Sequence, residues 1–77
     1  MNGRLIEVKN QLDGMIFTFE KTLKDNADKI SEEDKQKVEA AIASAKTELE
    51  SGDVERIKKA TETLANEGQA VFAKLYQ

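Results

Sequence analysis

The stretch LIEVKNQLDGMIFTFEKTL, residues 5–23, decides the fold because its apolar residues recur at intervals of three and four. That spacing places them along one side of an α-helix, whereas a half-buried strand would alternate apolar and polar residues. The predicted core-facing set is Leu5, Val8, Leu12, Met15, Ile16, Phe19 and Leu23. Ile6 and Phe17 fall outside this set, so the helix, expected over about 4–26, carries a second apolar edge.

Two later segments, about 32–50 and about 53–77, show the same helical periodicity. Their predicted core-facing residues are Val38, Ala41, Ile42, Ala45 and Leu49, then Val54, Ile57, Ala60, Thr61, Leu64, Gly68, Val71 and Leu75. The connections between the segments are short, and short connections join antiparallel neighbours. We therefore expect an all-α, antiparallel three-helix bundle over residues 4–77, with residues 1–3 as start or vector-derived residues outside it.

Gly68 stands on the core-facing side of the third segment, where alanine would favour the helix more. A glycine at this position indicates either a close approach by another helix, or a bend or break near residues 66–68. We favour the second interpretation, so the third helix is expected to be bent or broken near Gly68.

The helix ends carry recognisable signals. Ser31 and Asp53 are predicted N-caps, because a side-chain oxygen there can accept a hydrogen bond from a free amide of the first turn. Gly52 is predicted to end the second helix in the left-handed conformation that glycine adopts without steric cost.

The acidic stretch DNADKISEEDK, residues 25–35, contains five carboxylates and needs a separate explanation. A calcium-binding loop would have an oxygen ligand at its third position and glycine at its sixth, but Ala27 and Ile30 occupy those positions. General acid–base catalysis needs carboxylates held in a desolvating pocket, and these are expected in water among lysines. We interpret the stretch as a corner between helices, whose acids favour the positive end of the second helix dipole.

The composition argues against most chemistry. The 77-residue chain contains neither histidine nor cysteine, which removes the commonest catalytic base and the thiol nucleophile. A net charge of -3 argues against binding to nucleic acid or to an anionic membrane, and no apolar run approaches the length of a transmembrane span. We expect no enzymatic activity, no metal site and no cofactor in this segment.

Three stretches occur in an order that resembles a known family: EKTLKDNADKISEEDK at 20–35, VEAAIASAKTELESGDVERIKKATETL at 38–64, and AKLYQ at 73–77, with VKNQ at 8–11 preceding them. Together they resemble the C-terminal helical lid of the seventy-kilodalton heat-shock chaperones, in the DnaK-type form of bacteria and mitochondria.

The resemblance implies a lid that closes over the peptide-binding β-sandwich of an ATP-dependent chaperone and slows release of bound unfolded polypeptide. Its partners would be the parent's own β-sandwich and the parent's unfolded clients. ATP and magnesium would bind only to the ATPase domain of the parent, whose location would be the bacterial cytoplasm or, alternatively, the mitochondrial matrix. The alternative function is a free-standing three-helix module that binds a protein partner.

The resemblance also implies site residues. Asp13 matches the acidic residue that the family uses as an interdomain latch, two positions after an Asn-Gln pair. Phe17 takes the place of a histidine that joins this latch in one well-known member of the family. Leu5, Ile6, Met15 and Phe17 are candidates for contacting the sandwich or, in its absence, for weak self-association through the first helix.

One departure from the family pattern bears on where the first helix ends. Ala27 stands where the family usually has glycine, and alanine does not adopt the left-handed conformation cheaply. Either Asn26 takes that conformation instead, or the first helix continues for a residue or two.

Overall fold

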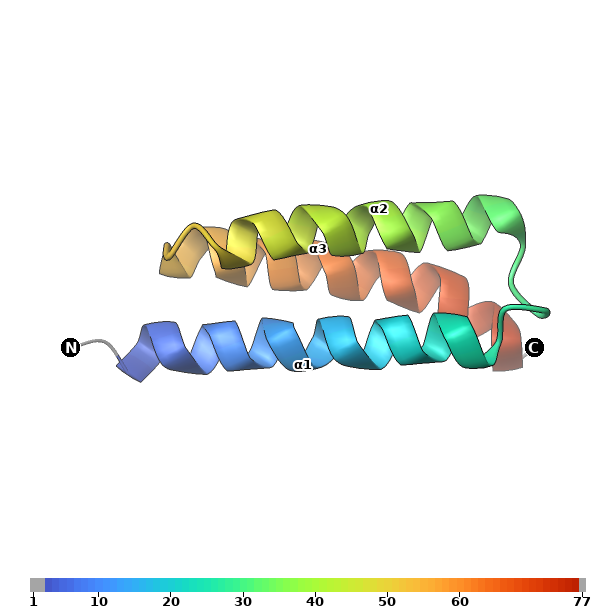
Figure 1. Ribbon diagram of the computed structural model, residues 1–77, viewed down its shortest axis with the longest axis horizontal. Helices are drawn as coiled ribbons and strands as arrows, with labels where there is room; N and C mark the ends of the chain where they lie inside the picture. Colours follow the sequence, from blue (N-terminus) through green and yellow to red (C-terminus); the bar gives the residue numbers. More distant parts are fainter. Residues whose placement is uncertain (1–2, 77) are drawn as a thin grey trace.

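The chain folds into three helices that pack side by side in an antiparallel up-down-up order (Figure 1). The computed structural model describes residues 3–76 and places α1 at Gly3–Asp25, α2 at Glu32–Leu49 and α3 at Val54–Phe72. A short 3-10 helix, η1, follows at Ala73–Tyr76. The result is a rod of 44 × 17 × 17 Å. The predicted all-α, antiparallel three-helix bundle is confirmed.

The helix bounds differ slightly from those expected. α1 and α2 each end one residue earlier than predicted, at Asp25 and Leu49. The third helix was expected to run to residue 77, but its α-helical part stops at Phe72 and tightens into η1. Gln77 lies outside the described residues.

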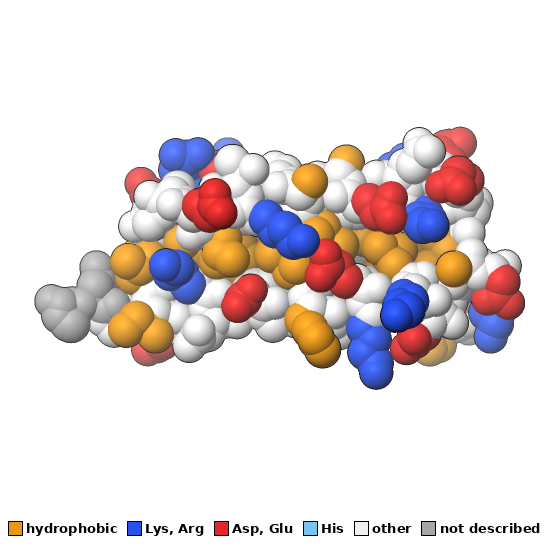
Figure 2. Space-filling model, viewed as in Figure 1, with side chains coloured by type: hydrophobic (Ala, Val, Ile, Leu, Met, Phe, Trp, Pro, Cys, Tyr) orange, Lys and Arg blue, Asp and Glu red, His pale blue; other side chains and the backbone are white. Residues whose placement is uncertain are grey.

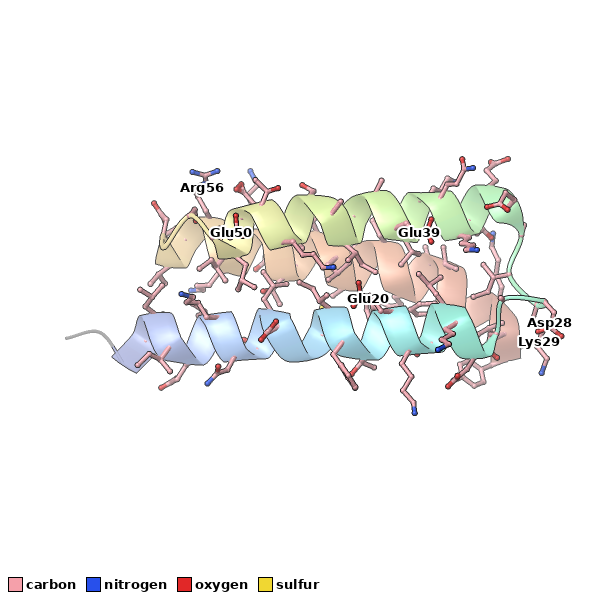
Figure 3. The ribbon with its side chains drawn as sticks, viewed as in Figure 1. Glu20, Asp28, Lys29, Glu39, Glu50 and Arg56 are labelled. Atoms are coloured by element: carbon pink, nitrogen blue, oxygen red, sulfur yellow. The ribbon has the colours of Figure 1, made fainter. Side chains whose placement is uncertain are left out.

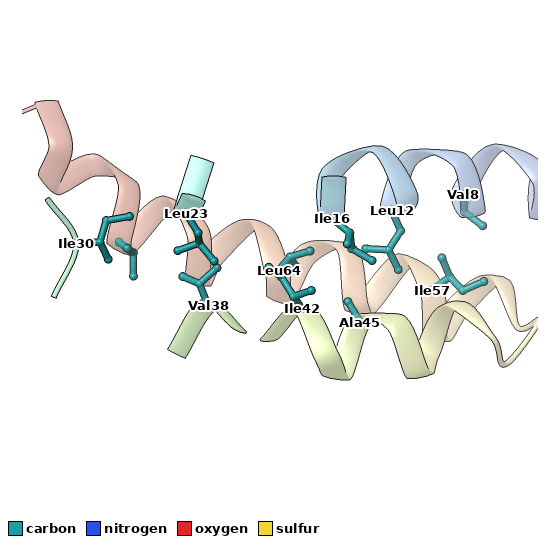
Figure 4. Close-up of a cluster of buried hydrophobic side chains, with 11 residues drawn as sticks. Val8, Leu12, Ile16, Leu23, Ile30, Val38, Ile42, Ala45, Ile57 and Leu64 are labelled. Atoms are coloured by element: carbon teal, nitrogen blue, oxygen red, sulfur yellow. The ribbon is translucent and has the colours of Figure 1, made fainter. Parts of the chain in front are cut away.

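The core runs the length of the rod and follows the predicted apolar sides of all three helices (Figure 4). Leu12, Val38, Ile57 and Leu64 have the largest fully buried side chains. Leu5, Met15, Phe19, Leu49 and Leu75 are partly buried and pack against them. Burying such side chains stabilises the fold by about 1.5–3 kcal/mol each.

Ile30 belongs to the core although it lies in the loop between α1 and α2, only 9% exposed. The sequence predicted a corner between helices over residues 25–35 and gave no sign that Ile30 belongs to the core. Figure 4 shows Ile30 at one end of the buried cluster, beyond Leu23 and Val38. The acidic corner is therefore anchored to the bundle by one apolar side chain.

Gly68 does not interrupt α3, which is α-helical without a break from Val54 to Phe72. A bend or break was expected near this residue; the break is wrong, and the close approach, which was the other interpretation, is correct. A Cβ atom at Gly68 would lie 2.2 Å from the ring of Phe19 on α1. That ring also packs edge-on against Phe72, with ring centroids 5.1 Å apart. Glycine is required here because the aromatic ring occupies the space of a side chain.

The predicted caps are confirmed. The Ser31 hydroxyl accepts a hydrogen bond from the Asp34 amide at 3.1 Å, and the Asp53 carboxylate accepts one from the Arg56 amide at 3.1 Å. Gly52 has a φ of 70°, the left-handed conformation expected after α2.

Asn26 does not take the left-handed conformation, because no non-glycine residue among residues 3–76 has a positive φ. That prediction is wrong, and α1 does not continue past Asp25 either. The Asn26 carbonyl instead accepts hydrogen bonds from the amides of Lys29 and Ile30, at 2.8 and 3.1 Å. The side-chain amide of Asn26 donates to the carbonyl of Thr22, so hydrogen bonds on both sides of the residue shape the turn.

Candidate docking face on α1

The side of α1 that faces away from the bundle is the candidate functional surface. We call it the outer face of α1, and it consists of Ile6, Asn10, Asp13 and Phe17. Successive members are four, three and four residues apart, so they form one stripe at 3.6 residues per turn. All four are exposed, because Leu12 and Ile16 turn the opposite side of the helix into the core.

Two large apolar side chains stand on this face. Ile6 is 61% exposed and Phe17 is 69% exposed, and both were predicted from the sequence to lie off the core-facing side. Figure 2 shows hydrophobic side chains along the seam between α1 and α2, and others standing out on the outer edge of α1. Among residues 3–76, the exposed large apolar side chains are Ile6 and Phe17 on α1 and Tyr76 of η1.

Leu5 and Met15 lie elsewhere. Both are partly buried against the core cluster, so they flank the outer face without belonging to it. The predicted edge of four apolar residues is therefore reduced to two exposed ones, Ile6 and Phe17. Leu5 and Met15 brace α1 against its neighbours, which fixes the direction in which the outer face points.

Asp13 is exposed near the middle of the outer face, between Ile6 and Phe17. Among the described residues it takes part in none of the ion pairs. Lys9, one turn before it and also exposed, takes part in none of them either. The sequence interpretation did not single out Lys9 or Asn10, although the helical period that places Asp13 on this face also places them beside it.

The ion pairs that do form link neighbouring helices of the bundle. Lys46 of α2 donates a hydrogen bond to Glu20 of α1 at 2.9 Å, and Figure 3 shows Glu20 in the space between these helices. Arg56 of α3 donates two hydrogen bonds to Glu48 of α2, and this contact raises the pKa of the Arg56 guanidinium. These charges are engaged within the bundle, whereas those on α1's outer face are not.

At the acidic corner, the carboxylate of Asp34 accepts a hydrogen bond from Lys74 of η1 at 2.9 Å. This contact lowers the pKa of Asp34 below its ordinary value of 3.8, mainly through that hydrogen bond. Asp28 and Lys29 project from the loop into solvent (Figure 3). Asp34 thus has a structural partner 40 residues away in the sequence. The sequence gave no sign of this partner, because several lysines lie closer to Asp34 along the chain.

A shallow groove runs between α1 and α2. Its floor is apolar and its rim carries both signs of charge; the lining residues are Glu20, Leu23, Lys24, Ala27, Lys35, Glu39, Ile42, Ala43 and Lys46. The Glu20–Lys46 ion pair joins two residues of its rim. Three lysines and two glutamates nearly cancel there, so the groove offers no concentrated field for an ionic ligand.

Within residues 3–76, no group of three or more carboxylate, histidine or cysteine side chains is placed to hold a metal ion. The described helices also include none with the length and apolar character needed to cross a membrane.

Comparison with known families identifies the bundle. The family model described as Hsp70 protein matches residues 2–77, nearly the entire chain. The chain belongs to the Hsp70 family. Membership in Hsp70 establishes a chaperone-related, heat-shock role, which confirms the coarser part of the sequence resemblance. No solved structure gives a significant match to the chain.

Proposed function

We propose that residues 4–77 are the helical lid of a DnaK-type Hsp70 chaperone, located in the bacterial cytoplasm or the mitochondrial matrix. The lid would close over the peptide-binding β-sandwich and slow the release of bound unfolded polypeptide. The observation that carries this proposal is the outer face of α1, where Ile6 and Phe17 are exposed on a helix whose other side is fully used by the bundle.

The apolar residues would supply the contact with the sandwich. Covering a large apolar side chain that is already partly exposed stabilises a contact by about 25 cal/mol per Å² of area removed from water. Phe17 stands where one well-known member of the family has a latch histidine, so an apolar contact would replace a polar one at that point. Leu5 and Met15, partly buried beneath the face, would keep it aligned.

Asp13 would act as the latch by pairing with a basic residue on a loop of the sandwich. An exposed ion pair contributes about 0–1 kcal/mol, which corresponds to at most about a fivefold change in a rate or equilibrium constant. A contact of this strength suits a gate that must open repeatedly. The absence of an ion partner for Asp13 among the described residues agrees with a partner supplied from outside the bundle.

Chemistry would remain with the parent protein. The lid itself would bind neither ATP nor magnesium and would catalyse no reaction, since both ligands would belong to the parent's ATPase domain. The lid's direct partner would be the sandwich, and its indirect partners would be the unfolded polypeptides that the sandwich holds.

A free-standing three-helix binding module is the second candidate, because an exposed helix face with apolar anchors also suits a separate protein partner. The reading frame upstream of Arg4 separates the two. A nucleotide-binding domain followed by a β-rich segment supports the lid, and a stop codon or a signal sequence there contradicts it.

The direct test uses the parent chaperone with its sandwich and measures dissociation of a fluorescent apolar peptide. We expect Asp13→Ala and Phe17→Ala each to accelerate peptide release, the first by up to about fivefold. Glu62→Ala and Tyr76→Ala serve as matched controls, since both residues are exposed outside α1. Release rates that are unchanged in both α1 variants would refute the lid proposal.

A further inference from the structure

Gly14 has no role inside the bundle. It lies in the middle of α1, and a Cβ atom at this position would meet nothing within 4 Å. Glycine in a helix interior is destabilising relative to alanine, and at Gly68 the nearby ring of Phe19 explains why it is needed. Gly14 adjoins the outer face of α1, so the available explanation is a close approach by something outside the bundle.

The outer face of α1 is self-complementary when reversed. The midpoint between Ile6 and Phe17 falls between residues 11 and 12, and the midpoint between Asn10 and Asp13 falls at the same place. Read in either direction, the face therefore runs apolar, polar, polar, apolar. Two copies related by a two-fold axis at that midpoint would place Ile6 opposite Phe17 at each end.

The charges fit the same arrangement. In the antiparallel pair, Lys9 of one copy would lie beside Asp13 of the other, about 1.5 Å apart along the helix axis. Asn10 of one copy would lie one residue, about 1.5 Å along the axis, from Gly14 of the other. Because Gly14 has no side chain, there is room for the Asn10 side chain beside it. A parallel pair would instead set Asp13 of one copy against Asp13 of the other, and like charges repel.

We infer that the outer face of α1 binds a second copy of this chain, forming a weak antiparallel dimer through α1. The interface is small, with two large apolar side chains from each copy, so it belongs to the class of weak, transient contacts. We expect a dissociation constant on the order of 0.1 mM. The inference stands on the face itself and does not depend on the lid function.

The two occupants of this face exclude each other. In a lid, the sandwich would cover Ile6 and Phe17, so pairing with a second copy would require an open or separated lid. The two proposals can also fail separately. Peptide release in the parent tests the lid, whereas association of the 77-residue chain tests the dimer.

The first experiment is analytical ultracentrifugation of the 77-residue chain from about 10 µM to about 1 mM at physiological salt, the range that brackets the expected constant. We expect the average mass to rise towards that of a dimer. Phe17→Asp should raise the dissociation constant by about tenfold or more, whereas Tyr76→Asp, at another exposed aromatic residue, should leave it unchanged. Circular dichroism verifies that both variants keep their helices. A single-chain mass at the highest concentration overturns the inference.

A charge exchange tests the pairing directly. Lys9→Glu alone would bring acidic groups together in the dimer, and Asp13→Lys alone would bring basic groups together, so each variant should stay monomeric. A mixture of the two variants places opposite charges at every such contact, and it should associate. Failure of the mixture to associate, when the unmodified chain does, excludes the proposed pairing of Lys9 with Asp13.

The direction of the pair is measured with a spin label, because the chain has no cysteine and Lys24→Cys gives a single labelling site. In the antiparallel pair the two labelled positions lie about 37 Å apart along the axis, given 1.5 Å per residue. In a parallel pair they would be neighbours. A short distance between labels would overturn the antiparallel arrangement.

Discussion

Replacing Gly68 with alanine is the most direct test of how α1 and α3 pack. The new Cβ atom would lie 2.2 Å from the Phe19 ring, whereas carbon atoms in ordinary contact lie about 3.5 Å apart. The ring would have to move by about 1.3 Å, the difference between these two distances. Moving it also disturbs the edge-on contact between Phe19 and Phe72.

The size of the effect follows from three opposing contributions. Overpacking costs about 1–3 kcal/mol, and loss of the aromatic pair costs up to about 1.5 kcal/mol. The better helix propensity of alanine offsets this by about 0.8–1 kcal/mol. We therefore expect Gly68→Ala to lower the free energy of unfolding by about 0–4 kcal/mol, with a central value of about 2 kcal/mol.

Urea unfolding at low protein concentration, followed by circular dichroism, measures the change. Gly14→Ala is the matched control, because nothing lies within 4 Å of its Cβ position, and it should stabilise the chain by about 0.8–1 kcal/mol. In a Phe19→Leu background, Gly68→Ala should lose most of its cost. If Gly68→Ala stabilises the otherwise unchanged chain as much as Gly14→Ala does, the argument for close packing at Gly68 is refuted.

Three further predictions concern the connections between helices, and urea unfolding measures each of them. Ile30→Ala should destabilise the bundle by about 2–3 kcal/mol, because it empties the end of the core; a change of a few tenths would show that the loop is not anchored. Gly52→Ala should cost about 1 kcal/mol because its φ of 70° strains any residue with a side chain, and a neutral result would contradict that conformation. Asp34→Asn should destabilise the chain at pH 7, because it removes the ionised carboxylate that Lys74 contacts. The pKa of Asp34 is lowered in the folded state, so its stabilising contribution is present above the ordinary value of 3.8 and is lost as the pH falls through the lowered pKa. The difference in the free energy of unfolding between Asp34→Asn and the unmodified chain should therefore shrink as the pH falls below 3.8, and a constant difference would exclude the ionic contribution of Lys74.

The helices and most of the core were predictable because helix geometry links sequence spacing to burial over short distances. Leu12, Ile57 and Leu64 are all nearly inaccessible, and each was placed on the core-facing side by its three- and four-residue neighbours. The caps at Ser31 and Asp53 follow from local chemistry in the same way. Ile30 was missed because a loop has no period that distinguishes an inward from an outward side chain.

Contacts between distant parts of the chain were not predictable. Gly68 was assigned to a bend or break because its neighbours in sequence give no sign that Phe19, on another helix, fills the space beside it. Lys74 reaches Asp34 only because η1 and the start of α2 meet at the same end of the bundle. Tertiary partners of this kind require the arrangement of helices as well as their positions in the sequence.

The candidate site was partly predictable. Asp13, Ile6 and Phe17 lie on the outer face of α1 as the helical period indicates, whereas Leu5 and Met15 lie at the border between the two sides and turn inward. Whether a border residue on a helix is buried depends on which neighbouring helix packs against it, and periodicity alone does not identify that neighbour.

An odd number of helices has a mechanical consequence. In an antiparallel bundle with an even number of helices, the first and last residues would lie at the same end. Here Gly3 and Tyr76 lie at opposite ends of a rod 44 Å long (Figure 1). Any polypeptide joined to both of these residues would be held apart by that length. The bundle is thus a stiff spacer, and a rotation of α1 about its first turn would sweep the far end through a wide arc.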